Sequence, residues 1–162
     1  MIYSITYKDH NIEIHHDRDC ESPISLGDSE GIHLALGNLN NRYFSPKGAI
    51  SIEQGKELDR RKWHAFPVYM YAHSGIALST TPFSCPFDSG RLGTLYLKKS
   101  EFPPKTRRKS ALLILEEWAN YANGNCYGYR ILKDGEEIDS CWGFIGSKSV
   151  ETAAKEYINS LA

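Results

Sequence analysis

The segment CYGYRILKDGEEIDSCWGF, which runs from Cys126 to Phe144, decides the fold class of this chain. Two runs of strand-forming residues, 126–132 and 138–144, flank the dipeptide Asp134-Gly135. A two-residue hairpin turn requires positive φ at both central positions, and Asp-Gly is among the pairs that tolerate this best. The segment therefore predicts an antiparallel β-hairpin.

Helices are predicted on both sides of this hairpin. The residues after it carry apolar side chains at spacings of three and four, at Val150, Ala153, Ala154, Tyr157, Ile158 and Leu161. The residues before it show the same spacing at Leu112, Leu115, Ala119 and Ala122. A helix with such a pattern buries one face and leaves the other in solvent. Ser147 or Ser149 is available to cap the later helix.

Further upstream, most of the pattern is that of strands. Side-chain types alternate from one residue to the next at 1–7 and again at 12–14, which predicts two strands joined by a turn. An apolar, aromatic stretch predicts a buried hairpin from 66–72 and 76–80, followed by a long loop at 81–93 and a strand at 94–98. Residues 51–62 have a helix-forming composition interrupted by Gly55, and residues 17–41 are mostly loop apart from the apolar piece 32–36.

These elements predict an α+β fold, in which an antiparallel β-sheet built from hairpins carries two or three helices packed on one face. No repeat or linker divides the sequence, so residues 1–162 are expected to form a single α+β domain. A chain of this length buries about 70% of the surface that its unfolded form exposes. One hydrophobic core is therefore expected.

The composition excludes several classes of protein. Nineteen basic against twenty acidic residues leave a formal net charge of -1, so no global field attracts the chain to nucleic acid. A hydrophobic fraction of 41% is that of a packed globule and not of a disordered chain. Without an apolar run of about 18 residues the chain is expected to be cytoplasmic. The four cysteines never form a C-x-x-C pair, so reduced thiols are expected.

The loop PFSCPFDSG, from Pro82 to Gly90, carries the densest set of reactive side chains. A catalytic interpretation takes Cys85 or Ser84 as the nucleophile and His73 as its base, with Asp88 or Asp139 orienting the histidine. The spacing matches no known protease signature. The preferred alternative is structural: Asp88 accepts backbone N–H groups within its own turn, and the cysteine packs as a small apolar group.

Two other clusters contain residue types that bind ligands, a metal ion in one case and nucleic acid in the other. Residues 15–21 (HHDRDCE) contain several metal-ligand types, but strand alternation points His15 and His16 to opposite faces, so we expect no bound metal. The basic run Lys105, Arg107, Arg108 and Lys109 is a candidate for nucleic-acid contact through phosphates, or else a solvated approach to the following helix.

Residues 138–144 form the second predicted strand of the hairpin around Asp134-Gly135, and their side chains divide between the two faces of the sheet. Alternation places Asp139, Cys141 and Gly143 on one face and Ser140, Trp142 and Phe144 on the other. The two aromatic side chains on one face are expected to belong to the core.

The stretch from Val68 to Gly90, with HSGI at 73–76 and PFSCPFDSG at 82–90, resembles a family of small, uncharacterised proteins carried by phages, plasmids and other mobile elements. Members typically read HSGI, PFSCPWDSG and later YGY and DSCWGF, which match residues 127–129 and 139–144 here. The likeness covers about half of the chain. This chain departs from the family at Phe87, where the family has tryptophan, and at Arg91-Leu92, where it has glutamine and valine.

The resemblance implies a mobile-element origin, which raises interference with host defence as a function. We expect a phage or mobile-element protein that inhibits a host defence system, of the anti-CRISPR or antirestriction type, by protein–protein contact. Its partner would be a host protein or a protein–nucleic acid defence complex, with no cofactor and no membrane contact. Binding contacts are expected from Ser84, Phe87, Asp88, Ser89, Arg91 and Trp142. The alternatives are a small cysteine- or metal-dependent hydrolase or nuclease, and a DNA-binding accessory protein.

Overall fold

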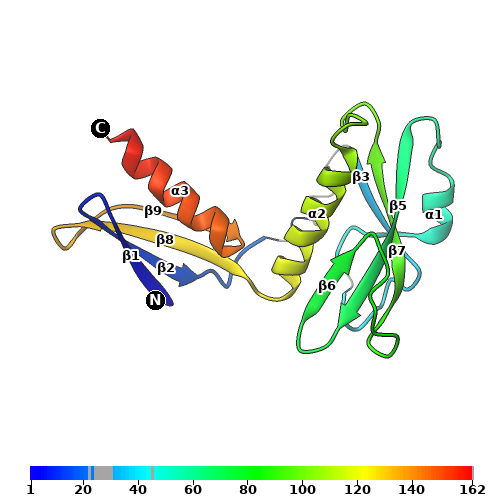
Figure 1. Ribbon diagram of the computed structural model, residues 1–162, viewed down its shortest axis with the longest axis horizontal. Coiled ribbons are helices and arrows are strands. Elements are labelled where there is room, and N and C mark those ends of the chain that lie inside the picture. The colour runs from blue at the N-terminus through cyan, green and yellow to red at the C-terminus, as the bar shows by residue number, and fades with distance from the viewer. Residues whose placement is uncertain (22, 24–30, 45, 162) are drawn as a thin grey trace. The chain divides into compact units, whose positions relative to one another are not determined.

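The computed structural model describes residues 1–21, 23, 31–44 and 46–161 and divides the chain into two compact units (Figure 1). The terminal unit combines both ends of the chain, Met1–Glu21 and Gly124–Ala162. The central unit comprises Ser22–Asn123. The predicted loop 17–41 lies partly outside the described residues, since 22 and 24–30 are not described.

The terminal unit is a four-stranded antiparallel sheet, in the order β1-β2-β8-β9, with one helix packed on it. Its elements are β1 (Tyr3–Tyr7), β2 (His10–His16), β8 (Cys126–Lys133), β9 (Glu136–Ile145) and α3 (Ser147–Ser160). Both hairpins close through two-residue turns with positive φ, at Lys8-Asp9 and at Asp134-Gly135. The hairpin predicted from Asp134-Gly135 is confirmed.

The core of the terminal unit joins β2 and β8 to α3. Its fully or nearly fully buried side chains are Ile12, Ile14, Tyr129, Ile131, Val150, Ala154 and Ile158. The predicted stripe on α3 is confirmed except at Leu161, which is exposed at the end of the helix. The prediction of a serine cap is wrong: the residue before α3 is Gly146, at φ 88, and no side chain caps the helix.

The predicted faces of β9 are wrong at Phe144, and the expectation that both aromatic side chains belong to the core is wrong for Trp142, which is 48% exposed. Tyr127 pairs with Phe144, but Tyr129 pairs with Cys141, so β9 carries one extra residue in a β-bulge. Gly143 lies in this bulge at φ 88. A bulge shifts the following side chain to the other face. Phe144 therefore packs against the α3 core, whereas Trp142 lies on the opposite face of the sheet.

The central unit contains a five-stranded sheet in the order β4-β3-β7-β5-β6. Its elements are β3 (Ile32–Leu36), β4 (Ile50–Ser51), α1 (Ile52–Lys56), β5 (Trp63–Ala72), β6 (Ile76–Ser79), β7 (Ser89–Lys98) and α2 (Arg107–Ala122). The short pair β3–β4 is parallel and the other pairs are antiparallel. The hairpin β5–β6 is confirmed, but β7 begins at Ser89, so the predicted loop 81–93 ends earlier. The apolar piece 32–36, within a stretch assigned mostly to loop, is strand β3.

Gly55 explains how closely α1 packs on the sheet. A Cβ atom at Gly55 would lie 2.9 Å from the Ala35 Cβ and from the Tyr96 ring, so only glycine lets this helix pack so closely on the sheet. Ser51 and Gln54 form a capping box at its start. The helix ends at Lys56, so the prediction of a helix over 51–62 is correct only for its first part.

Helix α2 packs on the central sheet with a different face from the one predicted. The buried residues are Ala111, Leu115 and Trp118, whereas Leu112 is 43% exposed. Only Leu115 belongs to both sets. The aromatic Trp118 has more apolar surface to bury than Ala119 or Ala122, and this sets the rotation of the helix.

The α+β class is confirmed, but the strands form two sheets and not one. Each unit has its own hydrophobic cluster, so the expectation of one core is wrong. The single domain expected for residues 1–162 stays a prediction, because compact units need not fold independently. Within the described residues, no helix is long and apolar enough to cross a membrane.

Candidate functional site

Residues 80–88, here called the proline loop, connect β6 to β7 and contain three of the six predicted binding residues, Ser84, Phe87 and Asp88. Several contacts hold the loop. The Ser89 hydroxyl donates to the Cys85 carbonyl, and the Ala72 N–H donates to the Asp88 carbonyl over 2.9 Å. The Thr81 N–H donates to the Ser79 hydroxyl over 3.2 Å. Together with Pro82 and Pro86, these bonds define the backbone of the loop.

The proline loop presents one aromatic side chain to solvent. Phe87 is 94% exposed, the highest value among the large hydrophobic residues that the structure describes. Beside it lies a hollow of about 300 Å³, lined by Phe87, Asp88, Arg91, Tyr43 and Met70 among others. Sequence reasoning missed Tyr43 and Met70 because they come from distant segments of the chain.

Of the contacts that the catalytic interpretation requires, the structure shows the one between His73 and Asp88. His73 Nδ1 lies 3.4 Å from Asp88 Oδ2, and both side chains are largely open to water, at 65% and 40% exposure. Asp139 instead accepts the Tyr129 hydroxyl at 2.8 Å within the terminal unit. Burial, assisted by this hydrogen bond, raises the pKa of Tyr129. A nucleophilic role for Cys85 or Ser84 stays a prediction.

Trp142, a predicted binding residue, lies in the terminal unit on the sheet face opposite α3. A Cβ atom at Gly128 would lie 2.1 Å from the Trp142 ring, so the indole covers the place where other residues have a side chain. The His15 ring lies beside it, 5.9 Å between centroids. The motifs at 127–129 and 139–144 therefore pack against each other, and Trp142 keeps 48% of its surface exposed.

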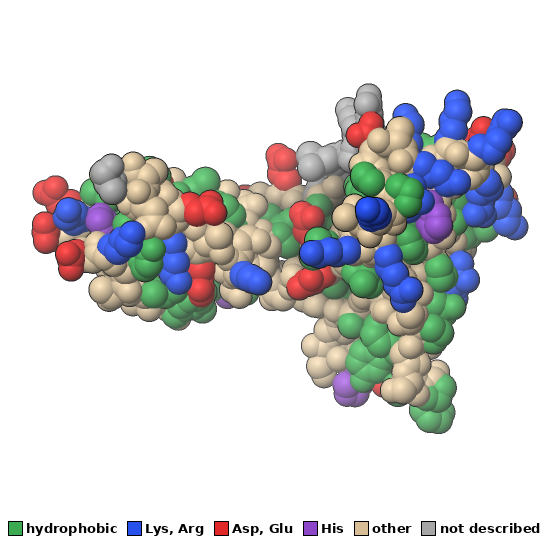
Figure 2. Space-filling view, turned by 45° about the horizontal axis from the view of Figure 1, so that its top comes forward, with side chains coloured by type: hydrophobic (Ala, Val, Ile, Leu, Met, Phe, Trp, Pro, Cys, Tyr) green, Lys and Arg blue, Asp and Glu red, His purple; other side chains and the backbone are tan. Residues whose placement is uncertain are grey.

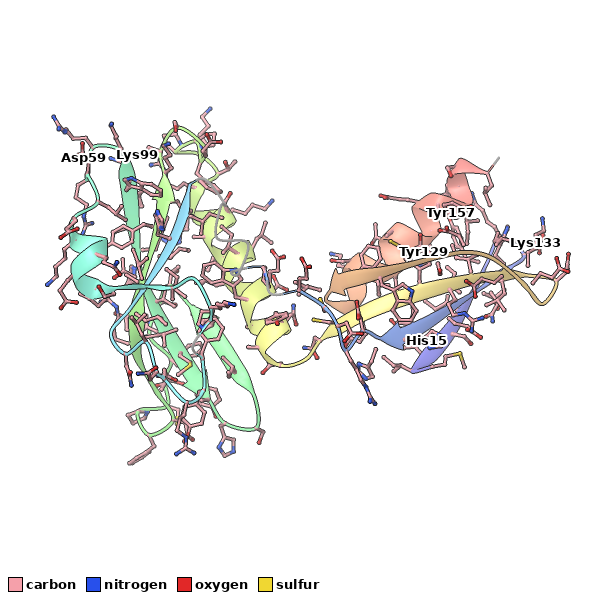
Figure 3. The ribbon with its side chains drawn as sticks, turned by 180° about the vertical axis from the view of Figure 1, so that it is seen from behind. His15, Asp59, Lys99, Tyr129, Lys133 and Tyr157 are labelled. Carbon is pink, nitrogen blue, oxygen red and sulfur yellow. The ribbon has the colours of Figure 1, made fainter. Side chains whose placement is uncertain are left out.

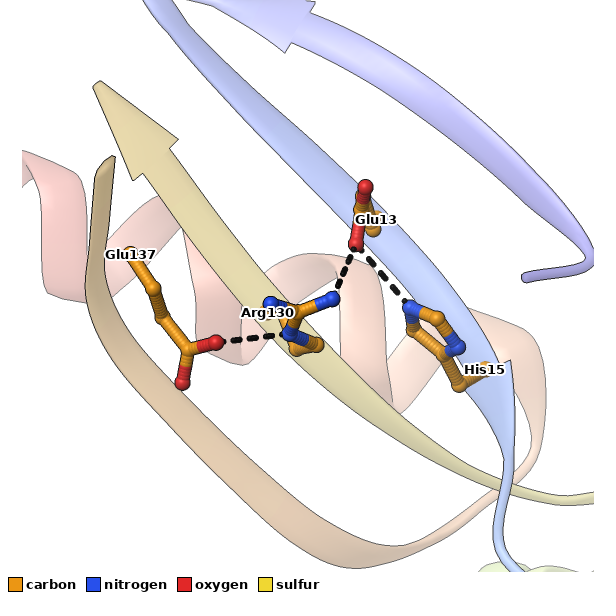
Figure 4. A network of polar contacts seen from close by, with 4 residues as sticks. All are labelled: Glu13, His15, Arg130 and Glu137. Atoms are coloured by element: carbon orange, nitrogen blue, oxygen red, sulfur yellow. Dashed lines mark hydrogen bonds and ion pairs between the residues drawn. The ribbon is translucent and has the colours of Figure 1, made fainter. Parts of the chain in front are cut away.

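The same face carries a polar network (Figure 4). Arg130 donates to Glu13 over 3.1 Å and to Glu137 over 2.6 Å, and His15 Nε2 lies 3.1 Å from the same Glu13 oxygen. Figure 3 shows His15 on this face, whereas Tyr129 lies on the side of the sheet that carries α3, the helix to which Tyr157 belongs. The carboxylates are occupied by Arg130 and the histidine, so the network serves to hold the sheet surface in place.

The cluster at 15–21 does not gather around one point. His15 faces Trp142, whereas His16 stacks on Tyr127 at 5.5 Å. The Asp17 carboxylate accepts the N–H of Asp19. In the part of the chain that is described, no three His, Cys, Asp or Glu side chains are placed to hold a metal ion.

The basic run at the start of α2 does not lie alone. Its neighbours in the fold are Arg60 to Lys62, before β5, and Lys98-Lys99, at the end of β7. Figure 2 shows Lys and Arg side chains gathered on one end of the central unit, and Figure 3 places Lys99 beside Asp59 at that end. The DRRK stretch at 59–62 was visible in the sequence, but its proximity to the run was not.

Two histidines lie at the same end and are held neutral. Burial lowers the pKa of His33, whose ring lies 4.9 Å from that of Trp63. Burial also lowers the pKa of His64, with a further contribution from the charges of Arg107, Lys99 and Arg60. At neutral pH the positive charge of this end therefore comes from lysine and arginine.

Searches of protein-family models, of curated proteins and of solved structures found no match to this chain.

Proposed function

We propose that this chain is a binding protein that contacts a partner protein through the proline loop, with Phe87 as the anchor. The observation that carries the proposal is the 94% exposure of Phe87 on a loop held by hydrogen bonds. Exposed aromatic side chains on a defined backbone are typical anchors of protein interfaces, because they bury a large area on binding and lose little conformational entropy.

The surroundings of Phe87 fit this role. The hollow beside it offers apolar surface from Met70 and Tyr43, and Arg91 lines its rim. Arg91 donates to the Gly93 carbonyl over 2.8 Å and lies over the Tyr69 ring, so its guanidinium is held in place before binding. The complementary partner surface has an apolar pocket for the phenyl ring, flanked by carboxylates.

The difference from the family that the sequence resembles supports the same role. That family has tryptophan where this chain has Phe87. At a position this exposed, both residues offer aromatic surface to a partner, whereas only tryptophan offers an N–H donor. The shared property is therefore the aromatic surface. The mobile-element origin that the resemblance implies favours a partner from host defence, either a host protein or a protein–nucleic acid defence complex.

The test replaces Phe87 and measures protection of a phage. The chain is expressed in a host whose restriction or CRISPR system blocks a test phage, and plating is compared for wild type, Phe87→Ala and Phe87→Trp. Wild type and Phe87→Trp are expected to restore plating, and Phe87→Ala to lose most of that effect. Leu113→Ala, which removes another exposed apolar side chain, is the matched control and should behave as wild type.

A photo-crosslinking residue introduced at position 87 tests the contact itself. It should crosslink to a component of the defence complex, and excess wild-type chain should compete. The same residue at position 113 should give no such product. If both positions crosslink equally, or if Phe87→Ala restores plating as well as wild type does, the proposal is wrong.

A further inference from the structure

Three segments far apart in the sequence form one basic surface on the central unit. They are Arg60 to Lys62, Lys98-Lys99 and Lys105 to Lys109, and together we call them the basic end. The basic end lies where β5 begins, where β7 ends and where α2 begins, which Figure 1 shows at one end of the sheet.

Backbone contacts place the first two segments side by side. Trp63, directly after Lys62, pairs with Lys98 in the β5–β7 ladder. The Lys99 N–H donates to the Lys62 carbonyl over 2.8 Å, and the Lys99 ammonium donates to the Arg60 carbonyl over 3.0 Å. The strand register thus forces these cations together.

The start of α2 brings the third segment to the same place. The Arg107 guanidinium donates to the Phe102 carbonyl over 3.0 Å, and the Phe102 N–H donates back to the carbonyl of Lys98 over 3.1 Å. The charges of Arg107, Lys99 and Arg60 all lower the pKa of His64, after the larger effect of burial. One imidazole therefore senses cations from all three segments.

The positive charge of the basic end is largely uncompensated by the residues that the structure describes. The three segments hold nine Lys and Arg side chains, and the acidic residues adjoining them in sequence are Asp59 and Glu101. Among the described residues, Asp59 with Arg61 is the only ion pair that includes a cation of the basic end. Holding like charges together costs free energy in the free protein, and a polyanion relieves that cost on binding.

Helix α2 adds to the positive potential. No side chain caps its first turn, and that turn contains no acidic residue. The helix dipole therefore points its positive end toward the basic end without local compensation. Four of the nine cations are arginines, whose planar guanidinium groups bind phosphate oxygens in pairs.

We propose that the basic end binds the phosphate backbone of duplex nucleic acid without reading its sequence. Phosphate contacts position a protein on a duplex, whereas base contacts are needed for specificity. Among the described residues, the aromatic rings at the basic end are at least partly buried and so do not form stacking platforms: Tyr96 is 3% exposed, and Trp63 packs against His33. This inference is independent of the protein contact made by Phe87, which lies in the proline loop.

The binding test uses a fluorescent 30-base-pair DNA duplex of random sequence and measures anisotropy over a series of salt concentrations. Two triple variants remove charge from different segments: Arg60→Gln/Arg61→Gln/Lys62→Gln and Lys105→Gln/Arg108→Gln/Lys109→Gln. The matched control, Lys133→Gln/Lys148→Gln/Lys155→Gln, removes three charges from the terminal unit. Thermal unfolding of each variant verifies that it is folded.

Each triple variant at the basic end is expected to weaken duplex binding about tenfold or more at physiological salt. It should also reduce the slope of log K against log salt by about 2 to 3, because each phosphate contact contributes about 0.9 to that slope. The control variant should bind the duplex with nearly the affinity of wild type, because the charges it loses lie outside the basic end. A second duplex of different sequence should bind with equal affinity.

Three results would overturn the proposal. One is equal loss of affinity in the control variant, which would indicate a net-charge effect. Another is stronger binding to polyglutamate or to anionic lipid vesicles than to the duplex, which would identify a different class of partner. The third is binding by wild type that does not depend on salt. None of these measurements depends on Phe87, so they separate this proposal from the protein-binding one.

Discussion

Each compact unit carries an exposed aromatic residue within a distinctive stretch of sequence, Trp142 in the terminal unit and Phe87 in the central unit, and the two have different surroundings. Trp142 lies over Gly128, beside His15, and keeps 48% of its surface exposed. Phe87 stands on the proline loop with 94% of its surface exposed. Unusual residues in the terminal unit hold the unit together, whereas those in the proline loop form a surface.

The same contrast extends to charge. In the terminal unit, Arg130 is paired on both sides by Glu13 and Glu137. In the central unit, the cations of the basic end outnumber the neighbouring carboxylates. Paired charges of this kind position a surface, whereas unpaired like charges are available to a ligand. A distinctive motif is therefore weak evidence for function until its exposure and partners are known.

The largest expected effect tests the packing of the central unit. Leu115→Ala should lower the free energy of unfolding by about 3 kcal/mol, because it removes a fully buried side chain and leaves a cavity. Leu112→Ala, three positions away on α2 and 43% exposed, should cost less than about 0.5 kcal/mol. Denaturant titration measures both, and equal losses would mean that α2 buries the face first predicted from the sequence.

Hydrogen exchange in the Leu115→Ala variant extends this test to the relation between the units. If residues 1–162 unfold as a single domain, protection of the amides in β8 should fall together with protection in β7. Unchanged protection in β8 would instead make the two units independent domains, against the expectation from length and composition.

A smaller effect is expected in the terminal unit. Gly128→Ala should lower the free energy of unfolding by about 2 kcal/mol, because the new methyl group overlaps the Trp142 ring and must displace it. The double variant Gly128→Ala/Trp142→Ala should recover part of this loss, since it removes the ring. Denaturant titration and tryptophan fluorescence follow the change. If the single variant is as stable as wild type, the position of the Trp142 ring does not require glycine at position 128.

The smallest effects are pH dependences, which differ in sign between the units. In the central unit the pKa of His33 and that of His64 are lowered from the usual 6.5, so the unfolded state binds protons more tightly. Stability is then complete above about pH 6.5 and falls as the pH drops below it. His33→Gln/His64→Gln should flatten this acid limb in a series of denaturant titrations.

In the terminal unit the dependence lies on the alkaline side. Burial and a hydrogen bond to Glu151 raise the pKa of Tyr3 from 10.0 to about 12. The folded state therefore holds the proton longer than the unfolded state, and stability is lost as the pH rises from about 10 to 12. Tyr3→Phe should remove this contribution. If Tyr3→Phe instead changed the loss of stability at low pH, the assignment of the low-pH dependence to the histidines and of the high-pH dependence to Tyr3 would be wrong.

Local pattern was enough to predict the hairpin around Asp134-Gly135, the helix after it and the hairpin β5–β6, because turn residues and apolar spacing act over a few positions. Local pattern did not predict which side chains are buried where that depends on contacts with residues far away in the sequence. The face of α2 depends on the sheet that receives Trp118, and the place of Phe144 depends on a bulge in the pairing of β9 with β8. The proline loop was identified from sequence, but the hollow beside it was not, since Tyr43 and Met70 come from other segments.

By itself the sequence determined the α+β class and most of the element positions, which follow from interactions between near neighbours. Only the tertiary structure decided that there are two cores, that Trp142 packs on Gly128, and that Arg60 to Lys62 meets Lys98-Lys99 and the start of α2. The physical reason is that strand pairing joins residues whose separation along the chain carries no local pattern. A net charge near zero therefore conceals a strongly basic surface.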